Sequence, residues 1–372
     1  MTEARLPIDK SDARSLARVG ITDDPSERSG SFVLRDDEPV CSQADADGLE
    51  LELIEIALQR HDWLRRDHYW KLVDPETDEY TRSLHAMERP QGFFLRVRAG
   101  EKVVLPAQTG LFLASEGTTQ RVHNIVVLEE GSELHLITGC VLRGGAAGGD
   151  HWAVTEAYIG KDAHLVNTMV HSWGPEAEVY PHAGTRVEAG GSYTSNYVSL
   201  KPVRKVVSNP RTWLVGAGAD VTYNSVIMGA ADSVIDTGGE VFLQAPDTAA
   251  QILHRGICSQ GRIFQRGLVV GEDRCRAHVD CSGLIIDPGE EGFISSVPSL
   301  RSRHVDAELS HEASIGKIAP EQVEYLESRG MTESQAIGMI IRGFLDTDIE
   351  GLGAELDGQI AEIAALARSA EG

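Results

Sequence analysis

Hydrophobic and polar residues alternate in short runs through the middle of the chain, whereas both ends show the three- to four-residue apolar spacing of helices. The alternating runs are residues 133–137, 193–200, 220–227, 240–243 and 278–281. Such alternation predicts strands with one buried face. We therefore expect a mostly β chain, with a mixed α/β region over 1–90, a β core over 91–312 and a helical region over 313–372.

Glycine-centred turns recur through the expected β core at intervals of about 20 to 30 residues. They lie at Gly131, Gly160, Gly190–Gly191, Gly216–Gly218, Gly238–Gly239 and Gly271. This interval is typical of one coil of a parallel β-helix, in which each coil buries its apolar face only by stacking on its neighbours. An antiparallel sandwich or jelly roll also gives short strands between turns, and it remains the alternative on this pattern alone.

One apolar run near the N-terminus fits two structures. Residues 49–60 begin with strand-like alternation, but the run is long and rich in charged, straight-chain residues, so we expect a helix. Three aromatic residues follow, Trp63, Tyr69 and Trp70, and we expect their side chains to anchor this region on the β core.

Two short helices with clear boundary signals are expected between residues 320 and 345. Pro320 suits a first helical turn, and Gly330 suits the left-handed position that ends a helix. Thr332 and Gln335 then have the spacing of a capping box. The second helix has two apolar stripes, one of Ala336, Met339, Ile340 and Phe344 and the other of Ile337, Ile341 and Leu345. Such a helix needs two partners, either both from its own chain or one from another protein.

Composition narrows the classes of function. The 372 residues are 41% hydrophobic, no apolar run approaches the length of a membrane span, and the first residues lack the apolar centre of a secretory signal. The net charge of −23 argues against a nucleic-acid partner. Five cysteines, an odd number without a Cys-x-x-Cys pair, argue against a disulfide framework and a zinc ribbon. We expect a cytoplasmic protein without a membrane partner.

The segment 310–345, SHEASIGKIAPEQVEYLESRGMTESQAIGMIIRGFL, resembles the C-terminus of the SufB/SufD family. Further matching motifs are 168–175, the run Gly256-Ile-Cys-Ser-Gln-Gly followed by 266–269, and His278-Val-Asp-Cys-Ser-Gly-Leu-Ile-Ile. The resemblance covers roughly residues 120–345, is dense from about 250 onward and is weak over 1–90. Family members are scaffolds for iron–sulfur cluster assembly in the SUF system. The resemblance implies a right-handed parallel β-helix core and a scaffold rather than an enzyme.

The resemblance also implies a ligand set for a transient iron–sulfur cluster. Cys281 matches an essential SufB cysteine, His311 matches a histidine of both SufB and SufD, and Glu312 matches a glutamate that SufB has and SufD lacks. A thiolate, an imidazole and a carboxylate hold a cluster less tightly than four thiolates would, which suits a scaffold that must release it. A flavin requirement does not follow from the sequence.

The same residues also allow purely structural interpretations. By alternation, Cys281 shares a face with Ala277 and Val279, which is typical of a core position unless Gly283 permits a twist that re-aims it. The pair His311-Glu312 alone suggests a strand end that orders a turn. Among the other cysteines, Cys258 and Cys140 are expected to be structural, with Cys140 open to a redox role. Cys275 lies in a polar turn and is expected to be either reactive or merely solvated.

One departure from the family affects the route of sulfur. Full-length bacterial SufB proteins carry a further internal cysteine that is thought to receive sulfur. The stretch taken to match it, residues 222–229, has no cysteine. Sulfur delivery from a cysteine desulfurase or another donor must therefore differ, or use Cys258 or Cys140.

The resemblance implies partners as well. The C-terminal helices would dock a SufC-like ABC ATPase. ATP hydrolysis would belong to that partner, because the chain has no Walker A motif of its own. A last amphipathic helix is expected over 352–366. Two copies would form a homodimer through their C-terminal strands, in place of the SufB/SufD heterodimer, and would pass clusters to apo iron–sulfur proteins. The rival classes are a SufD-like structural subunit without its own cluster and a β-helix carbohydrate-active enzyme, against which the low aromatic content of 6% argues.

Overall fold

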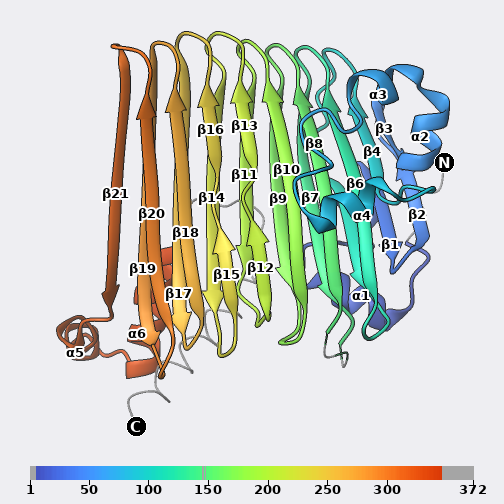
Figure 1. Cartoon of the computed structure of the whole chain (residues 1–372). Coiled ribbons are helices and arrows are strands. Elements are labelled where there is room, and N and C mark those ends of the chain that lie inside the picture. Colours follow the sequence, from blue (N-terminus) through green and yellow to red (C-terminus); the bar gives the residue numbers. More distant parts are fainter. Residues whose placement is uncertain (1–5, 145, 147, 346–372) are drawn as a thin grey trace.

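The structure is a computed structural model that describes residues 6–144, 146 and 148–345. Two sheets face each other and rise together in about eight coils, each of which contributes strand to both sheets (Figure 1). Successive coils pair in parallel register, for example β8 with β10 and β17 with β19. The expected parallel β-helix is thereby confirmed, and the antiparallel sandwich is excluded.

The first sheet, sheet A, runs from the N-terminal to the C-terminal end of the solenoid. In spatial order it contains β2 (Glu38–Ala44), β1 (Gly30–Arg35), β5 (Ala107–Leu113), β7 (Glu133–Leu142), β9 (His164–Ser172), β11 (Ser192–Ser199), β14 (Asp220–Gly229), β17 (Thr248–Ser259), β19 (Cys275–Asp287) and β21 (Ala307–Lys317).

The second sheet, sheet B, faces sheet A across the core. It contains β3 (Leu49–Leu53), β4 (Phe93–Val97), β6 (Thr119–Leu128), β8 (Asp150–Ile159) and β10 (Glu178–Val187), then four short strands, and finally β18 (Arg262–Gly271) and β20 (Phe293–Ser302). Of the short strands, β12 (Lys205–Ser208) and β13 (Arg211–Leu214) both pair with β10, whereas β15 (Val234–Thr237) and β16 (Glu240–Leu243) both pair with β18. Inward-facing aliphatic side chains of both sheets form one buried core along the solenoid.

The expected helix over residues 49–60 is wrong in its first half. Leu49–Leu53 is β3, which pairs antiparallel with β4, and α2 (Ile54–Arg60) begins only afterwards. Leu49 and Leu51 are buried in the solenoid core, so pairing with β4 overrides the helical preference of the charged residues between them. After α2 come α3 (Asp62–Asp67) and α4 (Glu79–His85), which cover the outer face of sheet B.

A buried carboxylate fixes this covering segment to the sheet. Glu156 of β8 accepts hydrogen bonds from the backbone N–H groups of residues 70–73, with distances of 2.6 Å to Trp70 N and 3.2 Å to Val73 N, and it contacts His123 Nε2 at 2.9 Å. Its side chain is fully buried. The ring of Trp70 lies 4.5 Å from that of His123, centroid to centroid, so the expected aromatic anchoring of this region is confirmed.

Helices also cover the outer face of sheet A. Helix α1 (Lys10–Ala17) lies near its N-terminal strands, after which a short 3-10 turn, η1 (Pro25–Glu27), leads into β1. Near the C-terminal strands lie α5 (Pro320–Ser328) and α6 (Glu333–Leu345). The expected boundary signals are confirmed: Gly330 has φ of +93°, and the Thr332 backbone N–H donates to Gln335 Oε1 at 2.8 Å.

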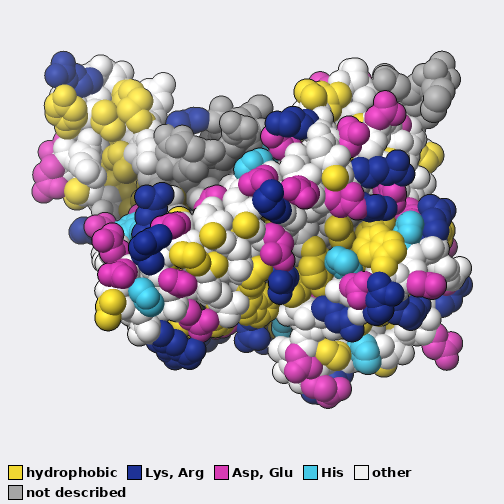
Figure 2. All heavy atoms as spheres, turned by 90° about the horizontal axis from the view of Figure 1, so that it is seen from above, with side chains coloured by type: hydrophobic (Ala, Val, Ile, Leu, Met, Phe, Trp, Pro, Cys, Tyr) yellow, Lys and Arg dark blue, Asp and Glu magenta, His cyan; other side chains and the backbone are white. Residues whose placement is uncertain are grey.

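The charge of the chain is distributed rather than segregated. On the face seen in Figure 2, acidic side chains are interspersed with lysine and arginine. Many of these charges pair across neighbouring coils, as Arg96 does with Glu50 and Arg211 with Glu240. Within the described residues, no helix has the length and apolar character needed to cross a bilayer.

Candidate functional site

One row of inward-facing side chains leads along sheet A to Cys281. Parallel register places each member directly beside the next on the following coil. The row consists of Thr138, Met169, Tyr197, Ser225, His254, Cys281 and Ala313. Cys281 thus supplies the single thiol of this row, and it lies directly beside the exposed edge strand β21. We refer to these seven residues as the Cys281 row.

The Cys281 thiol lies in the core of the last complete coil. Its residue is 0% exposed, and strand β19 keeps its regular register through this position, so Gly283 does not turn the side chain outward. Burial raises the pKa of the Cys281 thiol to about 12, and the neighbouring Asp280 carboxylate adds to the effect. The expectation that alternation points Cys281 inward, with Ala277 and Val279, is confirmed.

His311 and Glu312 lie in the middle of β21, not at a strand end. His311 pairs with Val279 and Glu312 pairs with Asp280. Strand alternation therefore puts His311 on the inner face, as a diagonal neighbour of Cys281, and Glu312 on the outer face beside Asp280. Both residues are exposed, because β21 is the edge of sheet A. The strand end expected from the pair His311-Glu312 is therefore wrong, because pairing with β19 continues to Lys317.

The described chain therefore brings together two of the three residues implied by the resemblance. Cys281 and His311 share a face and adjoining strands, whereas Glu312 points to the opposite side of the sheet. Within residues 6–144, 146 and 148–345, no three His, Cys, Asp or Glu side chains stand close enough to hold a metal ion. A complete set of metal ligands would therefore need further side chains or a different arrangement of these strands.

Three of the other four cysteines are buried, and Cys41 is partly buried. Cys258 is fully buried and its thiol donates to the Gly261 carbonyl at 3.2 Å, so its expected position in the core is confirmed. Cys275 is buried at the start of β19, so the expected solvated position in a turn is wrong: the strand begins earlier than the polar residues suggested. Cys140 is buried and faces an internal cavity.

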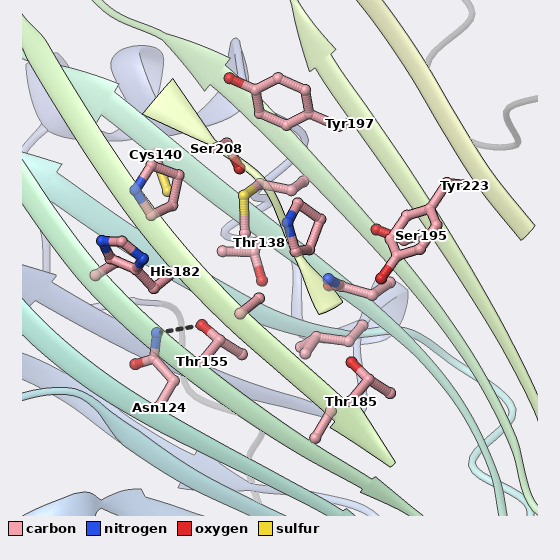
Figure 3. A pocket seen from close by; sticks show the side chains of 18 of the residues that line it. Asn124, Thr138, Cys140, Thr155, His182, Thr185, Ser195, Tyr197, Ser208 and Tyr223 are labelled. Carbon is pink, nitrogen blue, oxygen red and sulfur yellow. Dashed lines mark hydrogen bonds between the residues drawn. The ribbon is translucent and has the colours of Figure 1, made fainter. Parts of the chain in front are cut away.

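That cavity occupies the interior between the middle coils, with a volume of about 90 Å³ (Figure 3). Asn124, Thr155, His182 and Tyr223 are among the polar residues that line it, besides Cys140. Its His171 lies beside Cys140 in register and meets the Tyr197 hydroxyl through Nδ1 at 3.0 Å. Burial holds the pKa of His171 well below its ordinary value, so the ring is neutral.

Sequence reasoning missed His254, the member of the Cys281 row that precedes the thiol. Its ring is 2% exposed and burial lowers its pKa to about 4. Its Nε2 lies 3.0 Å from the Arg266 carbonyl oxygen, and its Nδ1 meets the Ser225 hydroxyl. Alternation from Ile252 would have pointed His254 inward, but its place beside Cys281 depends on the register between two coils, which the sequence does not contain.

Helix α6 presents one of its two apolar stripes to the body and the other more openly. Ile337, Ile341 and Leu345 are buried with residues of sheet A. In the other stripe, Ala336 is buried, Met339 is 48% exposed and Phe344 is partly buried. The helix expected over 352–366 lies outside the described residues.

Comparison with known proteins gives a consistent result. A family model described as "SUF system FeS cluster assembly, SufBD core domain" matches residues 111–344. An iron–sulfur cluster assembly SufBD family protein of Archaeoglobus fulgidus is 39% identical over 342 residues, which cover 92% of this chain and 91% of the relative. One from Methanothermobacter thermautotrophicus (strain Winter) is 36% identical and covers 94% and 86%. A Staphylococcus aureus (strain MRSA252) protein is 27% identical, and the match spans 64% of its length.

Proposed function

The chain belongs to the SufBD family and has a role in iron–sulfur cluster assembly, and from this premise we propose that it is the scaffold on which a new cluster is built. The proposed site lies at the edge of β21, where Cys281 supplies a thiolate, His311 an imidazole and Glu312 a carboxylate. The cluster is cargo that the scaffold later releases to apo iron–sulfur proteins.

A homodimer supplies what the single chain lacks. Among the described residues, strand β21 pairs on one side only, with β19, and such open edges are templates for pairing with another chain. In a two-fold antiparallel pairing with full overlap, the central residue of Ala307–Lys317, Glu312, faces its own copy. His311 of the second copy then faces Ala313, which is the register partner of Cys281.

The proposed cluster site rests on this pairing, because it aligns Cys281 and the second copy's His311 across the strands on the same face of the sheet. Only the methyl group of Ala313 lies between them, across two strand spacings of ~4.8 Å each. The two Glu312 carboxylates meet on the outer face. For Glu312 to reach the same cluster, the edge strands must twist or open, which we assign to ATP-driven motion of a partner.

The partner proposed to supply that motion is a SufC-like ABC ATPase that docks on α5 and α6. The half-exposed Met339 and the partly buried Phe344 support this location, because they leave an apolar surface beside the dimer edge. For sulfur from a cysteine desulfurase or another donor, the candidates are Cys140 and Cys258. Cys140 faces the internal cavity, whereas Cys258 is packed in the core.

The test is anaerobic co-expression with the ATPase, followed by purification, iron and sulfide analysis, and visible spectroscopy. The wild type should yield a complex with bound iron and sulfide, and the cluster should depend on Cys281. A complex that forms normally but never holds iron or sulfide would refute the scaffold role.

A SufD-like structural subunit without its own cluster is the second candidate. The observation in its favour is that Cys281 is fully buried and Glu312 points away from it. The same experiment separates the two, because a structural subunit should assemble with the ATPase and remain colourless until a second family member is added.

A further inference from the structure

We propose that Gln265 and His254 form a clasp across the solenoid core that holds Cys281 in place and limits access to its thiol. Both are positioning residues, because neither is assigned to the cluster itself. The inference rests on the proposed scaffold function, which gives the Cys281 thiol its task. It extends that function to two residues that the family resemblance did not indicate.

The first half of the clasp runs from sheet B to sheet A. Gln265 of β18 is 0% exposed, and its Nε2 donates to the backbone carbonyl of Ser282, the residue after Cys281, at 3.1 Å. Its Oε1 accepts from the Ser296 hydroxyl of β20 at 3.0 Å. A carbonyl can only accept, so these two contacts fix the orientation of the amide. The peptide bond that follows Cys281 is thereby tied to the opposite sheet.

The second half runs in the opposite direction, from sheet A to sheet B. His254 is the register partner of Cys281 on the neighbouring strand β17. Its Nε2 lies 3.0 Å from the backbone carbonyl oxygen of Arg266, which can only accept, so Nε2 carries the proton and donates. Nδ1 accepts from the Ser225 hydroxyl of β14, on the side of β17 away from Cys281. The clasp therefore joins β18 to both β17 and β19 at the level of Cys281.

Two glycines make room for the Gln265 amide. Gly256 and Gly283 are register partners on β17 and β19. A Cβ atom at Gly256 would lie 2.8 Å from Gln265 Nε2, and one at Gly283 would lie 2.9 Å from Ile294 Cδ1. Because neither glycine carries a side chain, the amide can approach the sheet closely enough to reach the Ser282 carbonyl.

A buried amide and a buried imidazole stabilise a core less than aliphatic side chains of similar size, because each must be desolvated. Ile263 and Val269, which also point inward from β18, are aliphatic. The competing interpretation is that Gln265 and His254 are ordinary members of the core, whose loss weakens the whole solenoid. The two interpretations differ in whether the Cys281 thiol is affected more than a buried thiol elsewhere.

Thiol alkylation of the full-length apo protein, under anaerobic native conditions and followed by mass spectrometry, tests the difference. Cys140, buried in the middle coils, is the internal reference. A variant that merely weakens the whole fold cannot raise the ratio of the Cys281 rate to the Cys140 rate. Gln265→Met keeps the size of the side chain but removes its donor. The ratio should therefore rise about three- to ten-fold, roughly the worth of the hydrogen bond to Ser282.

Two matched variants test the second half of the clasp. The amide nitrogen of glutamine reaches about as far as Nε2 of histidine, whereas that of asparagine reaches only about as far as Nδ1. His254→Gln should therefore keep the donor to the Arg266 carbonyl and the wild-type ratio. His254→Asn should lose that donor and raise the ratio about three- to ten-fold.

A control variant removes a buried hydrogen bond across the core at another level. Thr212 of β13 lies 2.7 Å from the Tyr223 hydroxyl of β14, which is two strands of sheet A before Cys281. Thr212→Val should not raise the ratio. Ser296→Ala keeps the test independent of whether Gln265→Met folds, since it removes only the hydroxyl that orients the amide and should raise the ratio about two-fold.

A wild-type ratio in Gln265→Met, Ser296→Ala or His254→Asn overturns the clasp, and so does an equal rise in Thr212→Val. Each of these results leaves the scaffold proposal intact, because that proposal is tested by the iron and sulfide bound to the complex. Conversely, raised ratios in a protein that never holds iron or sulfide would support the clasp and refute the scaffold role.

Discussion

The two ends of the solenoid are finished in different ways. At the N-terminal end the rings of Phe32 and Phe93 are buried 5.6 Å apart, and the outermost strands β2 and β3 run antiparallel to their neighbours. At the C-terminal end β20 and β21 run parallel to their neighbours, with Val297 and Ile315 each 45% exposed. One end has the features of a completed core, whereas the other leaves strand edges and apolar side chains available beside the proposed ligands.

The difference indicates how stability and reactivity are divided along the chain. Toward the N-terminal end, the buried Glu156 carboxylate accepts hydrogen bonds from the backbone N–H groups of residues 70–73. At the C-terminal end, His311 and Glu312 are exposed. Substitutions should therefore cost stability at the first end and assembly or cluster binding at the second.

The largest effect is expected from Cys281→Ser. Serine is a poor ligand for iron compared with thiolate, so anaerobic reconstitution should give no visible-absorbing cluster, while circular dichroism shows a folded protein. Cys258→Ser is the control in reconstitution with free iron and sulfide, which does not depend on sulfur delivery: it should keep the cluster and lose about 1–3 kcal/mol of stability, because a buried hydroxyl costs more to desolvate than a thiol. A normal cluster yield in Cys281→Ser would remove this residue from the site.

The next effect should appear at the opposite end. The Glu156 carboxylate is buried and accepts hydrogen bonds from four backbone N–H groups. Glu156→Gln replaces one of its two acceptor oxygens with an NH₂ donor. The free energy of unfolding in denaturant titrations should therefore fall by about 3–5 kcal/mol. Glu130→Gln, which removes an exposed ion pair with Lys161, should cost less than about 1 kcal/mol. Equal stability of the two variants would mean that Glu156 does not hold residues 70–73 on sheet B as described.

Met339→Asp should separate docking from folding at the C-terminal end. Burying an unpaired carboxylate against a partner costs several kcal/mol, so co-elution with the ATPase should be lost while the homodimer persists in light scattering. Val104→Asp, at a 92% exposed apolar residue near the other end, should not affect co-elution. Unfolding of Met339→Asp would instead make this stripe part of the core, and the dock would then be sought over 349–368.

The smallest effect concerns the geometry of pairing. With full overlap of two β21 strands, the Glu312 carboxylates repel each other, so Glu312→Gln should tighten the apo homodimer about two- to five-fold in sedimentation equilibrium. Glu308 also lies on the outer face but would face Gly316 of the second copy, so Glu308→Gln should leave the dissociation constant unchanged. Equal effects of both substitutions would point to another register, and a monomeric wild type in the presence of the ATPase would exclude the pairing.

The sequence predicted the elements that depend on local pattern. Alternation identified the solenoid strands and pointed Cys281 inward, and boundary signals placed α5 and α6. It was wrong for residues 49–53, where pairing with β4 decides the structure. Alternation puts His311 and Glu312 on opposite faces once the segment is known to be a strand, but the face that each takes, and the place of His254 beside Cys281, depend on which residues of successive coils become partners. That register is set by packing between segments about 30 residues apart, and no local pattern carries it.

The unequal ends also determine how far assembly can proceed. A solenoid with two open parallel ends would stack head to tail, and each added copy would present a new edge, which is how filaments grow. Here the edge strand β2 opposes such stacking through its reversed direction, through Pro39, which lacks an N–H donor, and through a register shift in its pairing with β1. In the proposed homodimer, open edges would then meet open edges, and growth would stop at two copies.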